Sequence, residues 1–207
     1  MAINQPFFGS EELDLLRKVL ESGLVSSAAS DGPYVTKFEE GFARFISSRH
    51  AVAVSNGTAA LHAALVAAEV SEGDEVVIPA FTFVAAAEAV LLAGARPILA
   101  DINPETYALC ADSIEEALTR RTKAIIVTHL YGLPADLNPI KELAERRNLI
   151  LVEDAAQSLG AEYRGRHVGS IGDMACFSFY ATKNITTGEG GMVTTSDEEY
   201  AERLRLF

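Results

Sequence analysis

From Ala51 onward, short apolar runs rich in Val and Ile alternate with longer segments rich in Ala, Leu and Glu. Runs that are apolar throughout, rather than at every second position, are typical of strands buried on both faces by helices. This alternation predicts an α/β domain with a parallel sheet and right-handed crossovers. The expected strands are 51–55, 75–80, 96–101, 124–130 and 149–155, and the expected helices between them are 58–69, 82–93, 112–119 and 137–147.

Beyond Gly160 the rhythm changes, because two strand-like runs at 174–180 and 190–196 follow one another without a helix between them. We expect this pair to join the same sheet, with one of its strands antiparallel. The sheet then has about seven strands and is mostly parallel.

The first 50 residues precede the α/β pattern and indicate two helices. Ser10 is expected to cap the first helix and Gly23 to end it. The second helix is expected to start near Pro33, after an exposed loop at 24–32. At the other end, residues 197–207 have a helical pattern with no stop signal, so we expect the sequence to end inside an element.

The composition is that of a globular protein, with 49% apolar and 22% charged side chains in 207 residues. Lys and Arg number 17 against 29 Asp and Glu, which gives a net charge of −12. An acidic surface repels phosphate backbones and anionic lipids, so we expect neither a nucleic-acid nor a membrane partner. The longest uncharged stretch, 51–68, contains polar side chains that are costly in hydrocarbon, and we expect no membrane span.

Two cysteines, Cys110 and Cys176, are too few and too far apart for a disulfide framework, which favours a reducing compartment. We also expect no secretory signal, because the N-terminus lacks a basic and then apolar leader. The predicted location is the cytoplasm. The four histidines show no spacing of a metal motif, so we predict no metal site.

The turn Ser55-Asn56-Gly57-Thr58 lies between the first expected strand and the first helix after it. Unpaired N–H groups at a helix start, close approach at Gly57 and the Thr58 hydroxyl suit a phosphate group. The alternative is an Asn-Gly turn in which Thr58 merely caps the helix.

A second candidate is EDAAQ at 153–157, at the carboxyl end of an expected strand, where ligands of α/β sheets bind. Because neighbouring side chains of a strand point to opposite sides, only one of Glu153 and Asp154 should face the site. A carboxylate aimed at a pyridine nitrogen keeps that nitrogen protonated and makes the ring an electron sink. The alternative is that Asp154 caps a following helix.

The third candidate is Lys183, in a stretch poor in charge between an aromatic strand and a glycine-rich turn. A lysine in such surroundings can act as a nucleophile, although a lone lysine is far more often a solvated surface charge. Phe81 could stack on a planar ring or fill the core, and His129 could contact a ligand or be a structural histidine.

Taken together, these segments resemble those of the DegT-type sugar aminotransferases, which are fold-type-I enzymes dependent on pyridoxal 5′-phosphate (PLP). The matches keep the family's order and cover the chain from Gly32 to Gly191. The matching segments are SNGTAAL at 55–61, PAFTFVA at 79–85, HLYG at 129–132, EDAAQ at 153–157 and FSFYATKNITTGEGG at 177–191.

The resemblance implies a three-layer αβα sandwich like the large domain of aspartate aminotransferase. In that fold, residues 1–50 supply N-terminal helices and a substrate-side loop, and residues 51–207 form the PLP-binding large domain. Family members run to nearly twice this length and carry a C-terminal small domain that these 207 residues do not contain, so the sequence is expected to be either a fragment of a complete enzyme or an inactive natural truncation. They are homodimers, and a homodimer is expected here.

The resemblance also assigns roles by position. Lys183 matches the catalytic lysine that forms a Schiff base with PLP and later moves a proton on the substrate carbon. The other matched positions are cofactor-binding: Asp154 at the pyridinium, Gln157 near the phenolic oxygen, Gly57, Thr58 and Ser178 at the phosphate, Phe81 stacked on the ring, and His129 close to the cofactor.

The implied reaction moves an amino group from an amino acid, usually glutamate, through PLP to a keto group on a nucleotide-linked sugar. The TTGEGG ending after Lys183 resembles relatives that act at sugar C4, which favours a 4-keto-6-deoxyhexose. Two other readings stay open. One is a catalytically inactive or regulatory PLP-binding homologue, and the other is a nucleotide-binding α/β domain, although the glycine fingerprint GxGxxG is absent.

Overall fold

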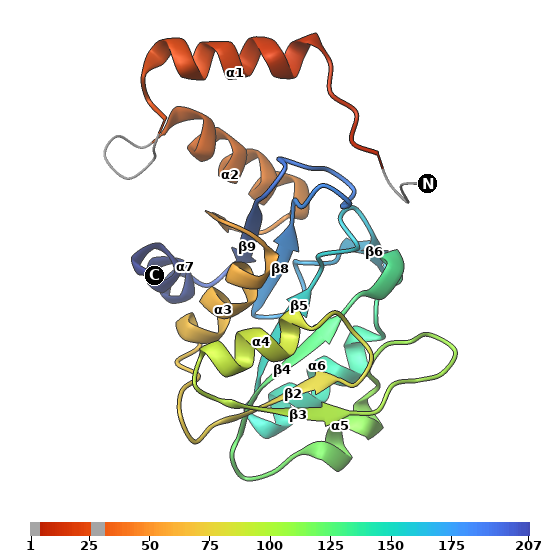
Figure 1. Cartoon of the computed structure of the whole chain (residues 1–207). Helices are drawn as coiled ribbons and strands as arrows, with labels where there is room; N and C mark the ends of the chain where they lie inside the picture. Colours follow the sequence, from red (N-terminus) through yellow and green to blue (C-terminus); the bar gives the residue numbers. More distant parts are fainter. Residues whose placement is uncertain (1–4, 26–31) are drawn as a thin grey trace.

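The computed structural model describes residues 5–25 and 32–207, and its centre is one seven-stranded sheet (Figure 1). Six strands share one direction, and β9 runs antiparallel to both of its neighbours, β1 and β8. The predicted parallel sheet with one antiparallel strand is therefore confirmed. In sheet order the strands are β1 (His50–Val54), β9 (Gly191–Thr195), β8 (Met174–Ser178), β5 (Ile150–Asp154), β4 (Thr122–Thr128), β2 (Glu75–Pro79) and β3 (Arg96–Ala100).

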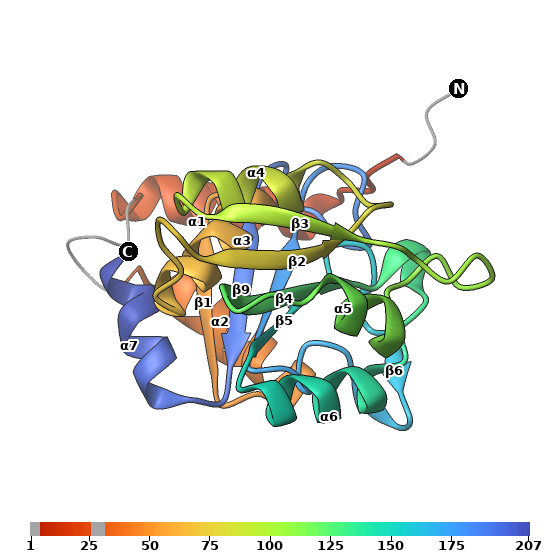
Figure 2. The same cartoon turned by 90° about the horizontal axis from the view of Figure 1, so that it is seen from below.

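Helices cover both faces of this sheet, which gives the expected three layers (Figures 1 and 2). Strand β4 shows why, because Ala124 and Ile126 pack toward α3 and α4 while Ile125 and Val127 pack toward α6. The helices are α1 (Ser10–Ser22), α2 (Pro33–Ile46), α3 (Gly57–Ala67), α4 (Ala85–Leu92), α5 (Ala111–Ala117), α6 (Leu137–Arg147) and α7 (Glu198–Leu206).

The two N-terminal helices differ in how they join this core. Phe42 and Ile46 of α2 are buried against β8, where the Phe42 and Phe177 rings meet edge to face at 4.9 Å. Helix α1 has no buried residue and lies across the top of the molecule in Figure 1. The division of the chain at residue 50 stays a prediction.

Three local expectations are corrected. Ser10 is the first helical residue rather than the cap, because Gly9 takes the cap position and its N–H donates to the Glu12 carboxylate at 2.6 Å. The helix expected from residue 82 begins at Ala85. Strand β3 is not buried on both faces, since it forms the sheet edge and leaves Leu99 63% exposed.

Other local features add to the prediction. Gly23 ends α1 in the left-handed conformation, as expected. The loop expected at 24–32 falls largely outside the described residues. The segment before β8 holds a small hairpin of β6 (Glu162–Tyr163) and β7 (Arg166–His167), which the sequence pattern did not indicate. No helix within the described ranges is long and apolar enough to cross a lipid bilayer.

Two glycines with positive φ near β8 offer a matched test of packing. Gly165 (φ 77°) has open space where a methyl group would stand, whereas a Cβ on Gly169 (φ 93°) would overlap the Phe177 ring and lie 3.3 Å from Ile46. We expect Gly165→Ala to lower the free energy of unfolding by about 1 kcal/mol and Gly169→Ala by about 3 kcal/mol, since only the second adds overpacking to backbone strain. Urea denaturation of both variants measures the difference, and equal losses would contradict it.

Candidate active site

A cavity of about 670 Å³ opens at the carboxyl ends of strands β5 and β8. Its walls come from the start of α3, from α4, from the end of β5 and from the segment that follows β8. Carboxyl ends of parallel strands are where α/β sheets bind ligands. Six of the residues predicted from the sequence line this cavity: Gly57, Thr58, Asp154, Gln157, Ser178 and Lys183.

The N-terminus of α3 forms one end of the cavity. The Asn56 side chain accepts a hydrogen bond from Ala59 N–H at 2.8 Å and caps the helix, so Thr58 is not the cap. A Cβ on Gly57 would lie 2.8 Å from the Ser178 Cβ, which shows how closely the helix start approaches the end of β8. Helix N–H groups beside two hydroxyl side chains suit an anion.

Asp154 ends β5 and lies at the inner wall of the cavity, 6% exposed. Its Oδ1 accepts a hydrogen bond from Ala156 N–H at 3.1 Å, and its Oδ2 lies 3.5 Å from the Thr128 hydroxyl. Burial raises the pKa of Asp154 above its ordinary value, although the Ala156 N–H and the Lys183 ammonium oppose the rise. A carboxylate held this way gains from a cationic hydrogen-bond donor placed in the cavity.

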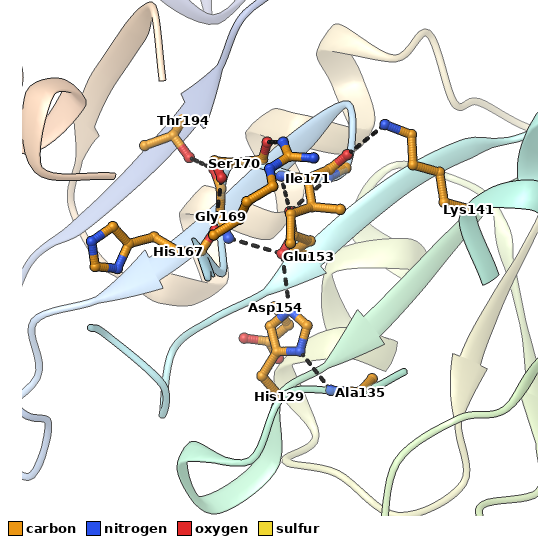
Figure 3. A network of polar contacts seen from close by, with 12 residues as sticks. His129, Ala135, Lys141, Glu153, Asp154, His167, Gly169, Ser170, Ile171 and Thr194 are labelled. Atoms are coloured by element: carbon orange, nitrogen blue, oxygen red, sulfur yellow. Dashed lines mark hydrogen bonds and ion pairs between the residues drawn. The ribbon is translucent and has the colours of Figure 1, made fainter. Parts of the chain in front are cut away.

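Glu153 points to the other face of β5, so only one of the two adjacent carboxylates faces the cavity, as predicted. It is fully buried and accepts hydrogen bonds from the His129 ring and from the backbone of Gly169, Ile171 and Gly172 (Figure 3). Burial by itself would raise the pKa of Glu153. The His129 and backbone donors outweigh it and hold the pKa below its ordinary value.

Lys183 lies half-buried in the segment that connects β8 to β9. Its backbone N–H donates to Tyr180 O at 2.9 Å, and the segment returns through Thr187 N–H, which donates to Phe179 O at 3.1 Å. Phe179 is 1% exposed and packs against Phe42 of α2. The turn that carries Lys183 is therefore anchored in the core while its side chain borders the cavity.

Gln157 borders the cavity from the turn after β5. Its Oε1 accepts a hydrogen bond from Tyr131 N–H at 3.2 Å. Tyr131 sits in the short 3-10 turn Leu130–Gly132 with a positive φ of 55°. The Gln157 side chain is thus oriented by the loop that follows β4.

Two predicted residues do not line the cavity. His129 is fully buried behind β5 with Glu153, and Phe81 is 47% exposed beside the Tyr107 ring, 5.8 Å away. The residues that sequence reasoning did not single out include Phe83, Tyr180 and Glu189, which border the cavity. Their positions inside the PAFTFVA and FSFYATKNITTGEGG segments were the available signal.

The start of α3 can hold an anion, and the Asp154 carboxylate can hold a cationic ring atom. The Lys183 side chain lines the same cavity. Within the residues that the structure describes, no group of three or more His, Cys, Asp or Glu side chains could hold a metal ion.

Three comparisons place this chain among known proteins. It is 45% identical over its whole length to GDP-perosamine synthase from Caulobacter vibrioides, of which it covers 55%. An aminotransferase structure from Psychrobacter cryohalolentis matches 98% of the chain and 51% of that protein, with 40% identity and a TM-score of 0.94. A sugar aminotransferase from Streptococcus pneumoniae, solved in its PLP form, matches all of the chain and 57% of that protein, with 29% identity and a TM-score of 0.91.

The chain therefore spans about half the length of the relatives that it matches. The family model for DegT/DnrJ/EryC1/StrS aminotransferases matches residues 7–207, which is nearly the whole chain. Enzymes of this family depend on PLP. On this match, and on the sheet and cavity described above, the chain belongs to the DegT/DnrJ/EryC1/StrS aminotransferase family.

Proposed function

We propose that this chain carries the cofactor site of a PLP-dependent aminotransferase that converts a nucleotide-linked keto sugar to the amino sugar. One observation carries the proposal: the fold brings Lys183, Asp154 and the Gly57 turn to the walls of a single cavity from three distant parts of the sequence. Each of these residues alone could have a purely structural role. Together, a lysine, a buried carboxylate and a helix N-terminus suited to an anion match what PLP requires.

The residues fit PLP at each of its polar ends. The start of α3 with Thr58 and Ser178 would hold the phosphate, and a side chain at Gly57 would close that space. Asp154, buried and with one backbone hydrogen bond at 3.1 Å, would hold the protonated ring nitrogen. When bound, PLP supplies an electron-accepting ring that carries the amino group between donor and acceptor.

The chain's own residues then divide the work. The Lys183 Nζ would hold the cofactor aldehyde and would move a proton to and from the substrate carbon. The Asp154 carboxylate keeps the ring nitrogen protonated. Gln157 offers an amide to the cofactor edge, and the phosphate end serves as a fixed anchor so that the reacting atoms stay in register.

For the substrates, we propose glutamate as amino donor and a 4-keto-6-deoxyhexose on a nucleotide as acceptor. The 45% identity to GDP-perosamine synthase supports a nucleotide-sugar acceptor. The TTGEGG sequence after Lys183, which resembles that of relatives acting at C4, supports the position of the keto group. Glu189 of that sequence borders the cavity, where it can contact a substrate.

We also propose a cytoplasmic homodimer. Cys110 and Cys176 are both free thiols, which is consistent with a reducing compartment. Large apolar side chains before and within α4 are exposed beside the cavity, among them Phe83 at 65% and Leu92 at 62%. A cluster of this kind is typical of a surface covered by another protein chain.

Light scattering of the purified protein measures its mass, and we expect the mass of a dimer. A monomer at micromolar concentration would count against the dimer.

The role of Lys183 is tested by absorbance after addition of PLP. PLP joined to a lysine amine absorbs near about 410–430 nm, and we expect this band in the wild type, its loss in Lys183→Ala, and its decay when glutamate is added. Lys37→Ala, on the exposed face of α2, is the matched control and should keep the band. A wild-type band that glutamate leaves unchanged would favour an inactive PLP-binding homologue. A band that persists in Lys183→Ala would contradict the assignment.

Asp154→Asn should separate catalysis from stability. Because burial raises the pKa of Asp154, its charged form costs stability in the cofactor-free protein, and this cost grows as pH rises through the folded-state pKa. We expect Asp154→Asn to melt higher than the wild type near neutral pH without PLP, and the gain to vanish below the ordinary Asp pKa of about 4. Transamination should fall by about 100-fold or more. Thermal melts across pH, without cofactor, measure the first effect, and a lower melting temperature at neutral pH would contradict it.

A further inference from the structure

The Glu153 carboxylate is saturated with donors although it does not reach the cavity (Figure 3). Its Oε2 accepts from His129 Nε2 at 3.0 Å and from Gly169 N–H at 2.8 Å. Its Oε1 accepts from Ile171 N–H at 2.9 Å and from Gly172 N–H at 2.7 Å. Four donors hold the Glu153 carboxylate in one position, because the loss of any donor would leave part of a buried charge without a hydrogen bond.

The His129 ring uses both nitrogens. Its Nδ1 accepts a hydrogen bond from Ala135 N–H at 3.1 Å, so that nitrogen carries no proton, and Nε2 donates to Glu153. The network thus assigns the neutral Nε2–H tautomer to a ring with no solvent exposure. Glu153 selects the tautomer in the way that a carboxylate orients a catalytic or metal-bound histidine.

His129 forms hydrogen bonds that fix both ends of the loop 129–135, which orients Gln157. Its backbone N–H donates to Asp154 O at 3.0 Å, and its ring holds Ala135 at the far end of the loop. Between these points Tyr131, with φ 55°, aims its N–H at Gln157 Oε1. Because the oxygen of the Gln157 amide is taken, its NH₂ group is the part left to donate into the cavity.

We propose that Glu153 and His129 are a positioning pair that acts on the cofactor site through Gln157, by fixing the loop 129–135 so that Tyr131 N–H holds the Gln157 amide with its NH₂ group toward the cavity. Neither residue touches the cavity itself. The inference deepens the proposed function and rests on it only where the cofactor is concerned.

The first test needs no cofactor. We expect His129→Leu to raise the amide hydrogen-exchange rates of Tyr131 and Ala135 by at least about tenfold, since the ring no longer holds the loop. His129→Gln should restore most of the protection, because one amide can donate to Glu153 and accept from Ala135. Unchanged Tyr131 exchange in a folded His129→Leu protein would overturn the inference.

Glu75→Gln is the matched control for lost stability. Glu75 is also a buried carboxylate, 2% exposed and paired with Arg121, but it lies at the amino end of β2, whereas the cavity lies at the carboxyl ends of the parallel strands β5 and β8. This variant should destabilise the protein without changing Tyr131 exchange. Faster Tyr131 exchange in both variants would show a general loosening and would also overturn the positioning role.

The second test is a double-mutant cycle on PLP affinity, read from the Lys183-dependent absorbance band. We expect Gln157→Ala and His129→Leu each to raise the Kd for PLP by about tenfold, and the double variant to be no weaker than Gln157→Ala alone. Effects that multiply would show that His129 does not act through Gln157. If the wild type gives no Lys183-dependent band, the proposed function fails while the exchange test still decides the loop's anchoring.

Discussion

The end of β5 is the constraint on which the site depends, because two neighbouring carboxylates there lie on opposite faces of one strand. The pleat sends Glu153 into the layer behind the sheet and Asp154 to the cavity. The two buried carboxylates differ in how many hydrogen bonds they accept. Glu153 is satisfied by four donors within the protein, whereas Asp154 accepts one backbone hydrogen bond at 3.1 Å and lies 3.5 Å from a hydroxyl. The protein thus satisfies the Glu153 charge more fully than the Asp154 charge, which borders the cavity.

Sheet topology brings the remaining parts of the site to Asp154. Strand β9 lies between β1 and β8, so the turn that leaves β1 and the end of β8 are only one strand apart. Glycines make this approach possible, since a Cβ on Gly57 would meet Ser178 and a Cβ on Gly191 would overlap the Asn56 carbonyl. The end of the cavity that we propose for the phosphate therefore comes from packing rather than from a continuous sequence motif.

The sequence predicts the fold well where the hydrophobic pattern is strong. Strands such as β4, in which residues 124–127 are all apolar, are recognisable because both faces are buried. Strand β3 has a similar pattern yet leaves Leu99 exposed, because strand order decides which strand forms an edge and sequence periodicity does not encode strand order. The predicted cap at Ser10 is wrong by one position because Gly9 and the Glu12 carboxylate cap the helix instead.

Part of the candidate site, like part of the fold, could be predicted from the sequence. Six of its residues could be identified because their local segments resemble one family in order and spacing. His129 shows the limit of that reasoning, since only the three-dimensional structure places its ring behind β5, in contact with Glu153 rather than with the cavity. Nothing in the linear sequence shows that the N–H groups of a distant glycine-containing turn at 169–172 converge on Glu153.

We propose that a single cavity holds PLP through its phosphate, its ring nitrogen and Lys183. A crystal structure of the protein grown with PLP tests this most directly. We expect the phosphate against the N-terminus of α3 and Ser178, the ring nitrogen within hydrogen-bond distance of Asp154, and continuous density from the Lys183 Nζ to the cofactor. PLP bound elsewhere, or bound in this cavity with its ring nitrogen turned away from Asp154, would contradict it.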